Sequence, residues 1–276
     1  MKINSELPLC MLSRNNQLNE YDFVLFHLYE SNQSYKEYFL NQRANHRDRI
    51  MIFDNSAYEY YIKGEKLDVD KYFEAICELK PDYYILPDVL MDKEKTINGV
   101  KDFINNYKGK IKQSYPLAVI QGDSVEELKD CINIYREMDI RNIAIPFHNS
   151  FFKDMVVDND VVEYISKYIS KYYIDFNEDV KYAMGRMQFV KNIYLELYDF
   201  DYVHLLGSHC PFEKGYYNSM IDSIDTGYPV KCAVMGYVLG EEPCKPNIII
   251  DEFLNENLGE EVVDLISNNV SIFKEL

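Results

Sequence analysis

Short apolar runs alternate with amphipathic segments along most of the chain. Between the runs, apolar residues recur at spacings of three and four, which is typical of helices packed on one face. The clearest runs cover residues 49–53, 82–87, 117–120, 142–145 and 202–206. Strands that alternate with helices in this way predict a parallel α/β fold.

The same pattern predicts where the elements lie. Further short apolar runs that we interpret as strands cover residues 7–12, 23–28 and 220–225. Helices are predicted at residues 34–42, 69–79, 93–107, 124–138, 161–173, 187–198 and from 260 onward. Asp68 is in place to cap the second of these helices, and the spacing of Ser124 and Glu127 is that of a capping box.

The predicted architecture is a TIM-like (β/α)8 barrel that forms a single domain over residues 1–276. A barrel of this kind needs about 250 residues, and no Gly/Ser-rich linker or repeat divides the chain. A barrel is preferred to an open doubly wound sheet because no GxGxxG or Walker-type loop is present.

Composition and charge narrow the function classes. The chain has no apolar run long enough to cross a membrane and no signal-peptide core at its start. Its six cysteines are scattered without a CxxC pair, which fits reduced thiols in a cytoplasm better than a disulfide framework. The formal net charge of −17 argues against a broad electrostatic grip on nucleic acid. It leaves room for a local basic cluster, and Arg43, His46, Arg47 and Arg49 form one, which fits a solvated loop better than a binding site.

Four polar side chains directly follow apolar runs, namely those of Asp54, Asp88, Gln121 and Asp225. The carboxyl ends of barrel strands converge on the catalytic face. Carboxylates that share one cavity repel each other, so the pKa of at least one should rise. An acid beside an ionised nucleophile suits displacement at a sugar carbon. Each aspartate taken alone also fits a simple cap of the following helix.

Five short segments resemble motifs of the tRNA-guanine transglycosylases, in the order in which that family has them. Residues 53–59, FDNSAYE, resemble the motif DSGG(F/Y)Q, and residues 86–88, LPD, resemble the strand end that carries the base-recognising acid. Residues 119–122, VIQG, are similar to IVQG, and residues 204–207, HLLG, to (H/Y)L(L/M)G. Residues 223–229, SIDTGYP, resemble MFDCVLP. Together the motifs span most of the chain.

The resemblance implies a pentosyltransferase that exchanges a guanine-type base through a covalent intermediate. Asp225 would be the nucleophile at the sugar C1′, and Asp54 the general acid and base. Asp88 and Gln121, with Gly122, would bind the base by its Watson–Crick edge, and Tyr58 would stack on it. The remaining residues carried over are Gly207, which would allow close approach of the base, and His204, which flanks the same site.

The departures from the family pattern point to a particular branch of it. The family binds zinc with a CxCxxC motif and a later histidine, whereas this chain has only Cys232 and Cys244 after Asp225 and no histidine beyond them. We therefore expect no metal, no cofactor and no zinc-binding subdomain. Ser56-Ala57 replaces the double glycine and Glu59 the glutamine. The nearer resemblance is to shorter, phage-type relatives that insert 7-deazaguanine bases into DNA, so DNA is favoured over tRNA, in a host cytoplasm if the chain is phage-encoded.

Two other functions remain open. The same carboxylates could act on a free nucleoside or nucleotide, as a glycosidase or transferase, and the acidic charge favours this alternative. A barrel could also bind a purine-like base without catalysis, as a subunit of a modification complex. A homodimer or a partner subunit would supply basic surface for a nucleic acid.

Several residues have competing interpretations. Asp222 rivals Asp225 as the nucleophile but fits the family spacing less well. His148 and His209 each fit a site or a packing role, and Cys210 beside His209 suggests a thiol catalyst without a partner to orient it. Tyr164, Tyr168 and Tyr172 lie at helical spacing and predict a helix surface that faces the barrel.

Overall fold

Eight parallel strands alternate with helices, and their order is that of the predicted TIM-like (β/α)8 barrel. The computed structural model describes residues 1–172, 176–217, 220–241, 248, 251–254 and 256–275. The order of the strands in the sheet is β1-β8-β7-β6-β5-β4-β3-β2, and every pair whose register is determined is parallel. The fold class predicted from the alternation of apolar and amphipathic segments is therefore confirmed.

The chain divides into two compact units, and the first is built from three separate segments. It contains residues 1–20, 147–198 and 203–276. Its strands are β1 (Lys2–Ser5), β7 (Tyr202–Leu206) and β8 (Ser223–Thr226). Its helices are the 3-10 helices η1 (Leu9–Arg14) and η3 (Phe152–Asp154), with α1 (Asn15–Leu18), α8 (Asn159–Tyr172), α9 (Glu178–Asn192), α10 (Tyr194–Leu197), α11 (Glu213–Tyr216), α12 (Tyr228–Val234), α13 (Asp251–Leu254) and α14 (Glu260–Glu275).

The second unit is almost continuous in sequence. It contains residues 21–146 and 199–202. Its strands are β2 (Asp22–Leu25), β3 (Met51–Asp54), β4 (Tyr83–Ile85), β5 (Tyr115–Val119) and β6 (Asn142–Pro146). Its helices are α2 (Phe26–Ser31), α3 (Gln33–Asn45), α4 (Ala57–Lys63), α5 (Val69–Leu79), α6 (Lys93–Tyr107), the 3-10 helix η2 (Lys108–Lys110) and α7 (Val125–Glu137).

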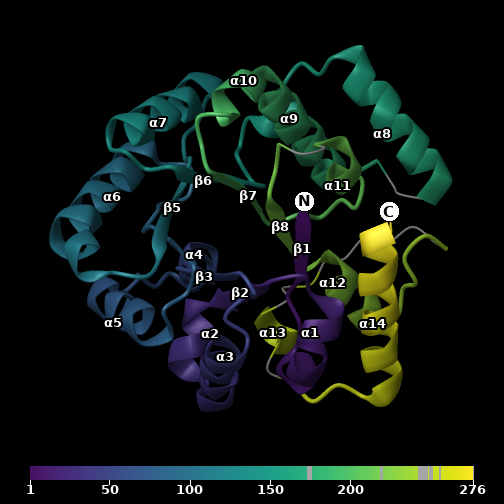
Figure 1. Ribbon diagram of the computed structural model, residues 1–276. Coiled ribbons are helices and arrows are strands. Elements are labelled where there is room, and N and C mark those ends of the chain that lie inside the picture. Colours follow the sequence, from purple (N-terminus) through teal and green to yellow (C-terminus); the bar gives the residue numbers. More distant parts are fainter. Residues whose placement is uncertain (173–175, 218–219, 242–247, 249–250, 255, 276) are drawn as a thin grey trace. The chain divides into compact units, whose positions relative to one another are not determined.

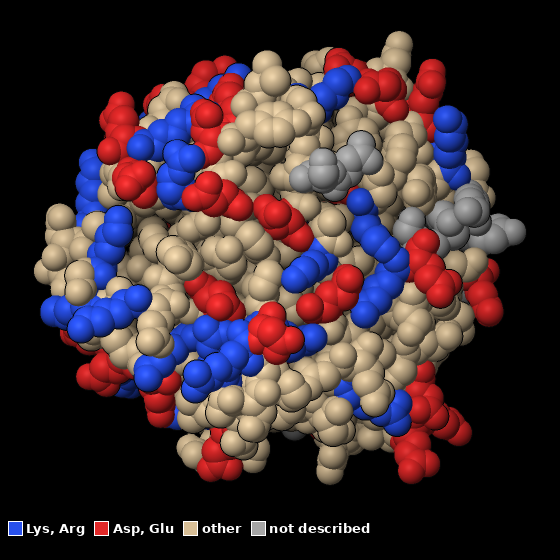
Figure 2. Space-filling view, viewed as in Figure 1, with Lys and Arg blue, Asp and Glu red and all other residues tan. Residues whose placement is uncertain are grey.

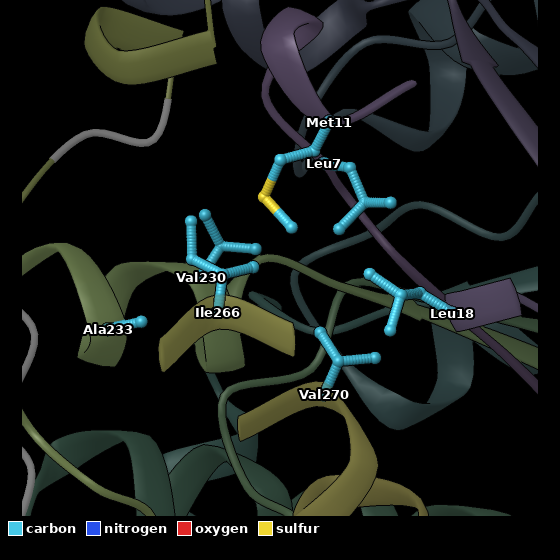
Figure 3. Close-up of a cluster of buried hydrophobic side chains, with 7 residues drawn as sticks. All are labelled: Leu7, Met11, Leu18, Val230, Ala233, Ile266 and Val270. Carbon is cyan, nitrogen blue, oxygen red and sulfur yellow. The ribbon is translucent and has the colours of Figure 1, made fainter. Parts of the chain in front are cut away.

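The two ends of the chain pack together inside the first unit. Helix α14, yellow in Figure 1, lies against α12 and α1. Apolar side chains from these three helices, from η1 and from the residue before Pro8 form one buried cluster, shown in Figure 3, whose members are Leu7, Met11, Leu18, Val230, Ala233, Ile266 and Val270. Arg14 adds hydrogen bonds to Asp264 and Ser267 at the edge of the cluster. Residues at the start of the sequence are thus fixed by its last helix.

Several predicted boundaries agree with the structure because strong local signals define them. Helices α5 and α6 span the predicted residues, and α14 begins at the predicted Glu260. The side chain of Asp68 accepts a hydrogen bond from the N–H of Lys71, as expected of a helix cap. Ser124 accepts one from Glu127 in the same manner. Strand β7 spans the predicted residues 202–206.

Other predicted elements are wrong or displaced. Residues 7–12 form no strand, because a 3-10 helix begins at Leu9. Leu7, which precedes this helix, and Met11, which lies in it, both belong to the buried cluster that includes side chains of α14. The strand predicted at residues 23–28 ends at Leu25, since a fully buried apolar run carries no periodicity that separates strand from helix. The helix predicted from Met187 begins at Glu178, where the side chain of Asn177 caps it.

The strand β1 was missed because three of its four residues, KINS, are polar. Lys2 to Ser5 pair with Ser223 to Thr226 of β8, so that Asn4 lies opposite Asp225. Polar residues in this strand are buried, Asn4 and Ser5 among them. A strand of this composition gives no apolar run to detect.

The surface and the cysteines bear on the compartment. In the described part of the chain, no helix is long and apolar enough to span a bilayer. Cys10, Cys77, Cys131 and Cys210 are free thiols, as expected, but Cys232 is in a disulfide, which corrects the expectation for that residue. Cys244 lies outside the described residues.

On the face shown in Figure 2, basic side chains are interspersed with acidic ones.

Candidate functional site

Asp225 lies near the carboxyl end of β8, with one carboxylate oxygen held by two donors. Its Oδ1 is 3.0 Å from Nε2 of His204 and accepts a hydrogen bond of 2.9 Å from the N–H of Gly207. His204 lies on β7, opposite Ser223 of β8 in the strand register. Its Nδ1 is 2.8 Å from the Ser223 hydroxyl. The first unit therefore brings together three predicted site residues, Asp225, His204 and Gly207.

The contacts of His204 determine which of its ring nitrogens donates a hydrogen bond and which accepts one. An ionised carboxylate can only accept, so Nε2 must carry a proton. In the neutral ring Nδ1 is then the acceptor, and the Ser223 hydroxyl donates to it. His204 is fully buried and Asp225 is 3% exposed. The carboxylate is thus fixed in one orientation, with Oδ1 tied to the protein.

Gly207 reaches Asp225 through an unusual backbone conformation. Its φ is +67°, in the left-handed region that an L side chain rarely adopts. This turn directs the N–H of Gly207 back toward the end of β8. The glycine predicted from the HLLG segment therefore has a conformational role at this position.

Asp222, the rival to Asp225, lies at the opposite end of β8. Its Oδ2 accepts a hydrogen bond of 2.8 Å from the N–H of Val203, where β7 begins. The backbone N–H of Asp222 donates a hydrogen bond to the carbonyl oxygen of Val203. Burial raises the pKa of the Asp222 carboxyl. Because active sites of barrels lie at the carboxyl ends of strands, this position favours Asp225.

A buried ion pair supports the loop that follows β7. Arg186 of α9 and Glu213 of α11 are both completely buried and form two hydrogen bonds of 2.9 and 2.7 Å. Arg186 also donates to the carbonyl oxygens of Leu206 and Gly207, at 3.1 and 2.8 Å. Burial is the largest single effect on the pKa of Arg186 and lowers it, but the charge and hydrogen bonds of Glu213, together with the charges of Tyr217 and Asp225, raise the pKa above its usual value. Arg186 therefore keeps its charge, and its hydrogen bonds anchor the turn that contacts Asp225.

Sequence reasoning missed this pair although one signal was available. Ala183, Met187 and Val190 are buried at the helical spacing that defines the inner face of α9. Arg186 lies on that same face, where an arginine is rarely buried without a partner. Nothing in the sequence identifies Glu213 as that partner, because it lies on a separate helix.

In the second unit, Asp88 and Gln121 come together as predicted. Oδ2 of Asp88 accepts a hydrogen bond of 2.7 Å from Nε2 of Gln121, and Oδ1 accepts one of 2.8 Å from Nδ2 of Asn55. Gln121 is oriented in turn by the N–H of Met91, which donates to its Oε1. Burial raises the pKa of the Asp88 carboxyl, against the opposing effect of the two amide donors. Each carboxylate oxygen is held from one side.

This arrangement leaves acceptor capacity on Asp88. A carboxylate offers about four lone-pair sites, and the two amides occupy one on each oxygen. Asp88 is partly exposed. A group with two adjacent N–H donors can therefore bind across its two oxygens. Asn55, which sequence reasoning quoted within its motif without assigning a role, also donates to the carbonyl of Leu86 and so couples the ends of β3 and β4.

Asp54 ends β3 and begins a tight turn. Its Oδ2 accepts a hydrogen bond of 2.7 Å from the N–H of Ser56, and its side chain is 8% exposed. Ser56 has a φ of +59° and a ψ of 34°, a left-handed conformation in which glycine is normally preferred. The Ser56 hydroxyl accepts from the N–H of His27 and is 2.9 Å from Nδ1 of that ring. These contacts hold a conformation that the residue type alone disfavours.

Substitution of Ser56 tests this explanation. Ser56→Ala removes both His27 contacts and keeps the strained backbone, so we expect it to lower the free energy of unfolding by about 1–3 kcal/mol. Ser56→Gly removes the same contacts but relieves about 1 kcal/mol of strain, so its cost should be smaller. Urea unfolding of both variants measures the difference. Equal costs for alanine and glycine would contradict the role given to the backbone strain.

The two remaining predicted residues of this unit differ in exposure. Tyr58, on α4, is 50% exposed, as a stacking platform must be. Gly122 has a structural reason to be glycine, since a Cβ at this position would lie 2.6 Å from Cβ of Glu127. Glu127 itself accepts from the N–H of Asp123 at the start of α7. Gly122 therefore shapes the turn that follows Gln121.

A third cluster of polar groups lies in the first unit. His148 follows β6, Asp179 is in the first turn of α9, and His209 is two residues beyond Gly207. One ligand atom from each lies within 4.8 Å of the other two, and Nδ1 of His209 is 3.2 Å from Oδ2 of Asp179. Burial, followed by the charge of His209, lowers the pKa of His148 to about 4. Burial works to raise the pKa of Asp179, but the hydrogen bond and charge of His209 bring it below its usual value.

The lowered pKa of His148 predicts a loss of stability in acid. Its ordinary value is 6.5, so below this pH the unfolded chain binds a proton that the folded chain does not. The free energy of unfolding should therefore fall as the pH drops from 6.5 to about 4, by up to about 1.4 kcal/mol per pH unit. Denaturant unfolding in the presence of a chelator, with His148→Gln as the comparison, measures this. A pH dependence that is the same in both proteins would exclude His148 as the cause.

The other candidates from the sequence have structural partners. Cys210 is buried, and burial together with Glu213 raises its pKa well above the usual value, so it is no thiolate nucleophile. Tyr164 packs against Tyr168 and Tyr216 and donates to the carbonyl of Phe212. The side chain of Tyr172 lies outside the described residues.

Two arginines of the predicted basic cluster are paired with acids. Arg43 forms two hydrogen bonds with Asp82, at 2.9 and 3.0 Å. Arg49 forms one of 2.8 Å with Asp22. Two of its arginines thus stabilise the second unit, which accords with a structural interpretation of the cluster.

Comparison of the chain with protein-family models found no match, and comparison with curated proteins found none either.

Proposed function

We propose that the protein is a base-exchanging transglycosylase that replaces guanine with a 7-deazaguanine derivative in nucleic acid. The observation that carries the proposal is the arrangement of Asp225. One oxygen of its carboxylate is held by His204 and by the N–H of Gly207 at the carboxyl end of a barrel strand. A carboxylate fixed in this way can present its other oxygen to an electrophilic carbon.

The reaction assigned to these residues is a double displacement. Oδ2 of Asp225 attacks C1′ of the sugar while the bond from C1′ to N9 of guanine breaks, and Asp54 gives a proton to the departing base. The incoming base then loses its N9 proton to Asp54, and its nitrogen attacks C1′ while the bond to Asp225 breaks. Two displacements retain the configuration at C1′, and no oxidant or reductant is needed.

The Asp88 cluster fits recognition of the exchanged base. Guanine and 7-deazaguanine share the N1–H and the exocyclic amine, two adjacent donors. The two oxygens of Asp88 are kept in place by Asn55 and Gln121 and match such a pair. Gln121 acts in this scheme by orienting Asp88, and Tyr58 offers an exposed ring for stacking.

DNA is the proposed polymer, modified in the cytoplasm, which is the host cytoplasm if the chain is phage-encoded. The choice of polymer rests on the resemblance to zinc-free relatives. The four free thiols accord with a reducing compartment, whereas the disulfide at Cys232 counts against it. A homodimer or a partner subunit is the proposed source of additional basic surface.

A second candidate function is transfer or hydrolysis on a free nucleoside or nucleotide. The formal net charge of −17 favours it, because a polyanion meets an average repulsion from an acidic surface. The same two aspartates would act, with water or a second base as the acceptor. A non-catalytic base-binding subunit has no need for a carboxylate oriented like that of Asp225.

Exchange of labelled base tests these functions against one another. The protein is incubated separately with DNA, with tRNA and with guanosine, each with radiolabelled guanine and in parallel with labelled 7-deazaguanine. Label recovered in DNA supports the proposal, and label in tRNA alone supports transglycosylation but contradicts the choice of polymer. Label in the nucleoside alone supports the second function. Binding of labelled base without any exchange indicates the non-catalytic role.

A further inference from the structure

Two histidines and one aspartate that the proposed reaction does not use converge in the first unit. They are far apart in the sequence and come from three places: His148 follows β6, Asp179 begins α9, and His209 lies in the loop after β7. Their ligand atoms lie within 4.8 Å of one another. All three residues are partly buried.

We propose that His148, Asp179 and His209 form a binding site for one divalent transition-metal ion of the zinc type. The proposal is independent of the transglycosylase function, because it rests on residues outside the Asp225 and Asp88 clusters. It also differs from the cysteine-based site whose absence the sequence indicates.

The donor set matches the coordination chemistry of such an ion. Zinc accepts imidazole nitrogen and carboxylate oxygen at about 2.0–2.2 Å, which in a tetrahedral site places ligand atoms about 3.4 Å apart. Nδ1 of His209 and Oδ2 of Asp179 are already 3.2 Å apart. An ion would take the place of the proton shared by these two atoms. The other ligand atoms, which lie at most 4.8 Å apart, would reach the tetrahedral spacing through small side-chain rotations.

The surroundings favour a defined site. The ring of Phe147 lies 4.8 Å from that of His148 and 4.9 Å from that of His209. The ring of Tyr182 also packs against His148, with ring centroids 5.1 Å apart. The cationic group of Arg186 lies over Phe147, and its charge is offset by the buried Glu213. Aromatic walls of this kind limit the rotamers of ligand side chains and restrict access of water.

Three protein ligands leave one position of a tetrahedral ion open to water, as in catalytic zinc sites. The ion would also link the loop after β6, the start of α9 and the loop after β7. The last of these begins at Gly207, whose N–H contacts Asp225. Metal binding is therefore expected to stabilise the loop that orients the proposed nucleophile.

Titration with Zn²⁺ tests the site without reference to activity. The protein is stripped with a chelator and titrated in competition with a chromophoric chelator, and the visible spectrum of bound Co²⁺ reports the geometry. A Cys10→Ser background removes the exposed free thiol, which could bind zinc by itself. The ligand variants are His148→Ala, His209→Ala and Asp179→Asn. His46→Ala is the matched control, because His46 is exposed and lies in the other unit.

The expected result is one Zn²⁺ per chain, with the intense absorption of tetrahedral Co²⁺ and a raised unfolding temperature. Each ligand variant should weaken binding by more than the roughly 10–100-fold that loss of an outer-shell partner causes, and His46→Ala should bind as the parent does. If a histidine variant misfolds by circular dichroism, Asp179→Asn, which preserves the side-chain shape, carries the test. Absence of saturable binding, or full affinity in any folded ligand variant, would overturn the proposal.

Discussion

Replacement of Asp225 by asparagine should abolish base exchange, with a loss of about 10⁴-fold or more in rate. Asparagine keeps the shape of the side chain and an oxygen that can accept from His204 and from the N–H of Gly207. It removes the negative charge and thus the nucleophile. A stable fold without reaction is therefore the predicted phenotype. The rate of incorporation of labelled guanine measures the effect.

The covalent intermediate gives a more direct readout of the same variant. Protein incubated with DNA and quenched in denaturant should yield a slowly migrating adduct, and Asp225→Asn should yield none. Asp222→Asn is the matched control, because it changes the same residue type three positions away at the other end of β8. An adduct that persists in Asp225→Asn but disappears in Asp222→Asn would exclude Asp225 as the nucleophile.

Among the substitutions proposed here, removal of the Glu213 side chain should lower the free energy of unfolding most. Glu213→Ala leaves the completely buried guanidinium of Arg186 without its counterion, which typically costs about 3–5 kcal/mol in the free energy of unfolding. Ser208 and Tyr217, whose hydroxyls donate to Glu213, also lose their partner. Urea unfolding followed by circular dichroism measures the change.

Two further variants separate the ion pair from general disruption. The double variant Arg186→Met with Glu213→Leu removes both charges and should recover part of the loss, since a buried pair is often replaceable by apolar residues. Asp264→Asn breaks the surface pair with Arg14, whose side chains are 42% and 74% exposed, and should cost less than about 1 kcal/mol. If the double variant is no more stable than Glu213→Ala, the unpaired charge of Arg186 is not the cause of the stability that Glu213→Ala loses.

The fold could be predicted because its signals are local and repeated. Helices α5 and α6 have strong amphipathic patterns and polar caps at Asp68 and Asp92, so their bounds follow from the sequence. Segments without periodicity were misassigned. The run from Phe23 is buried on every side and changes from strand to helix at Phe26, a change that depends on tertiary packing.

The sequence predicted those site residues that directly follow or end an apolar strand. Asp88 and Gln121 follow separate strands and are in contact, and His204 contacts Asp225. The groups that hold them were not predictable, because their partners come from distant parts of the chain. Arg186 contacts the carbonyl of Gly207 from helix α9, and His27 contacts Ser56 from helix α2.

The discontinuous first unit has a consequence for synthesis on the ribosome. The second unit is nearly complete once residue 146 has been made, so the pairing of β2 to β6 can begin while the chain is still growing. Strand β1 is made before the second unit, whereas its partner β8 and the helix α14, which packs with α1, are made after it. The nascent chain therefore carries β1 without its partner strand until residues 223–226 have been made. A prematurely terminated chain carries the Asp88 cluster but no Asp225, and its unpaired β1 is a surface for chaperones.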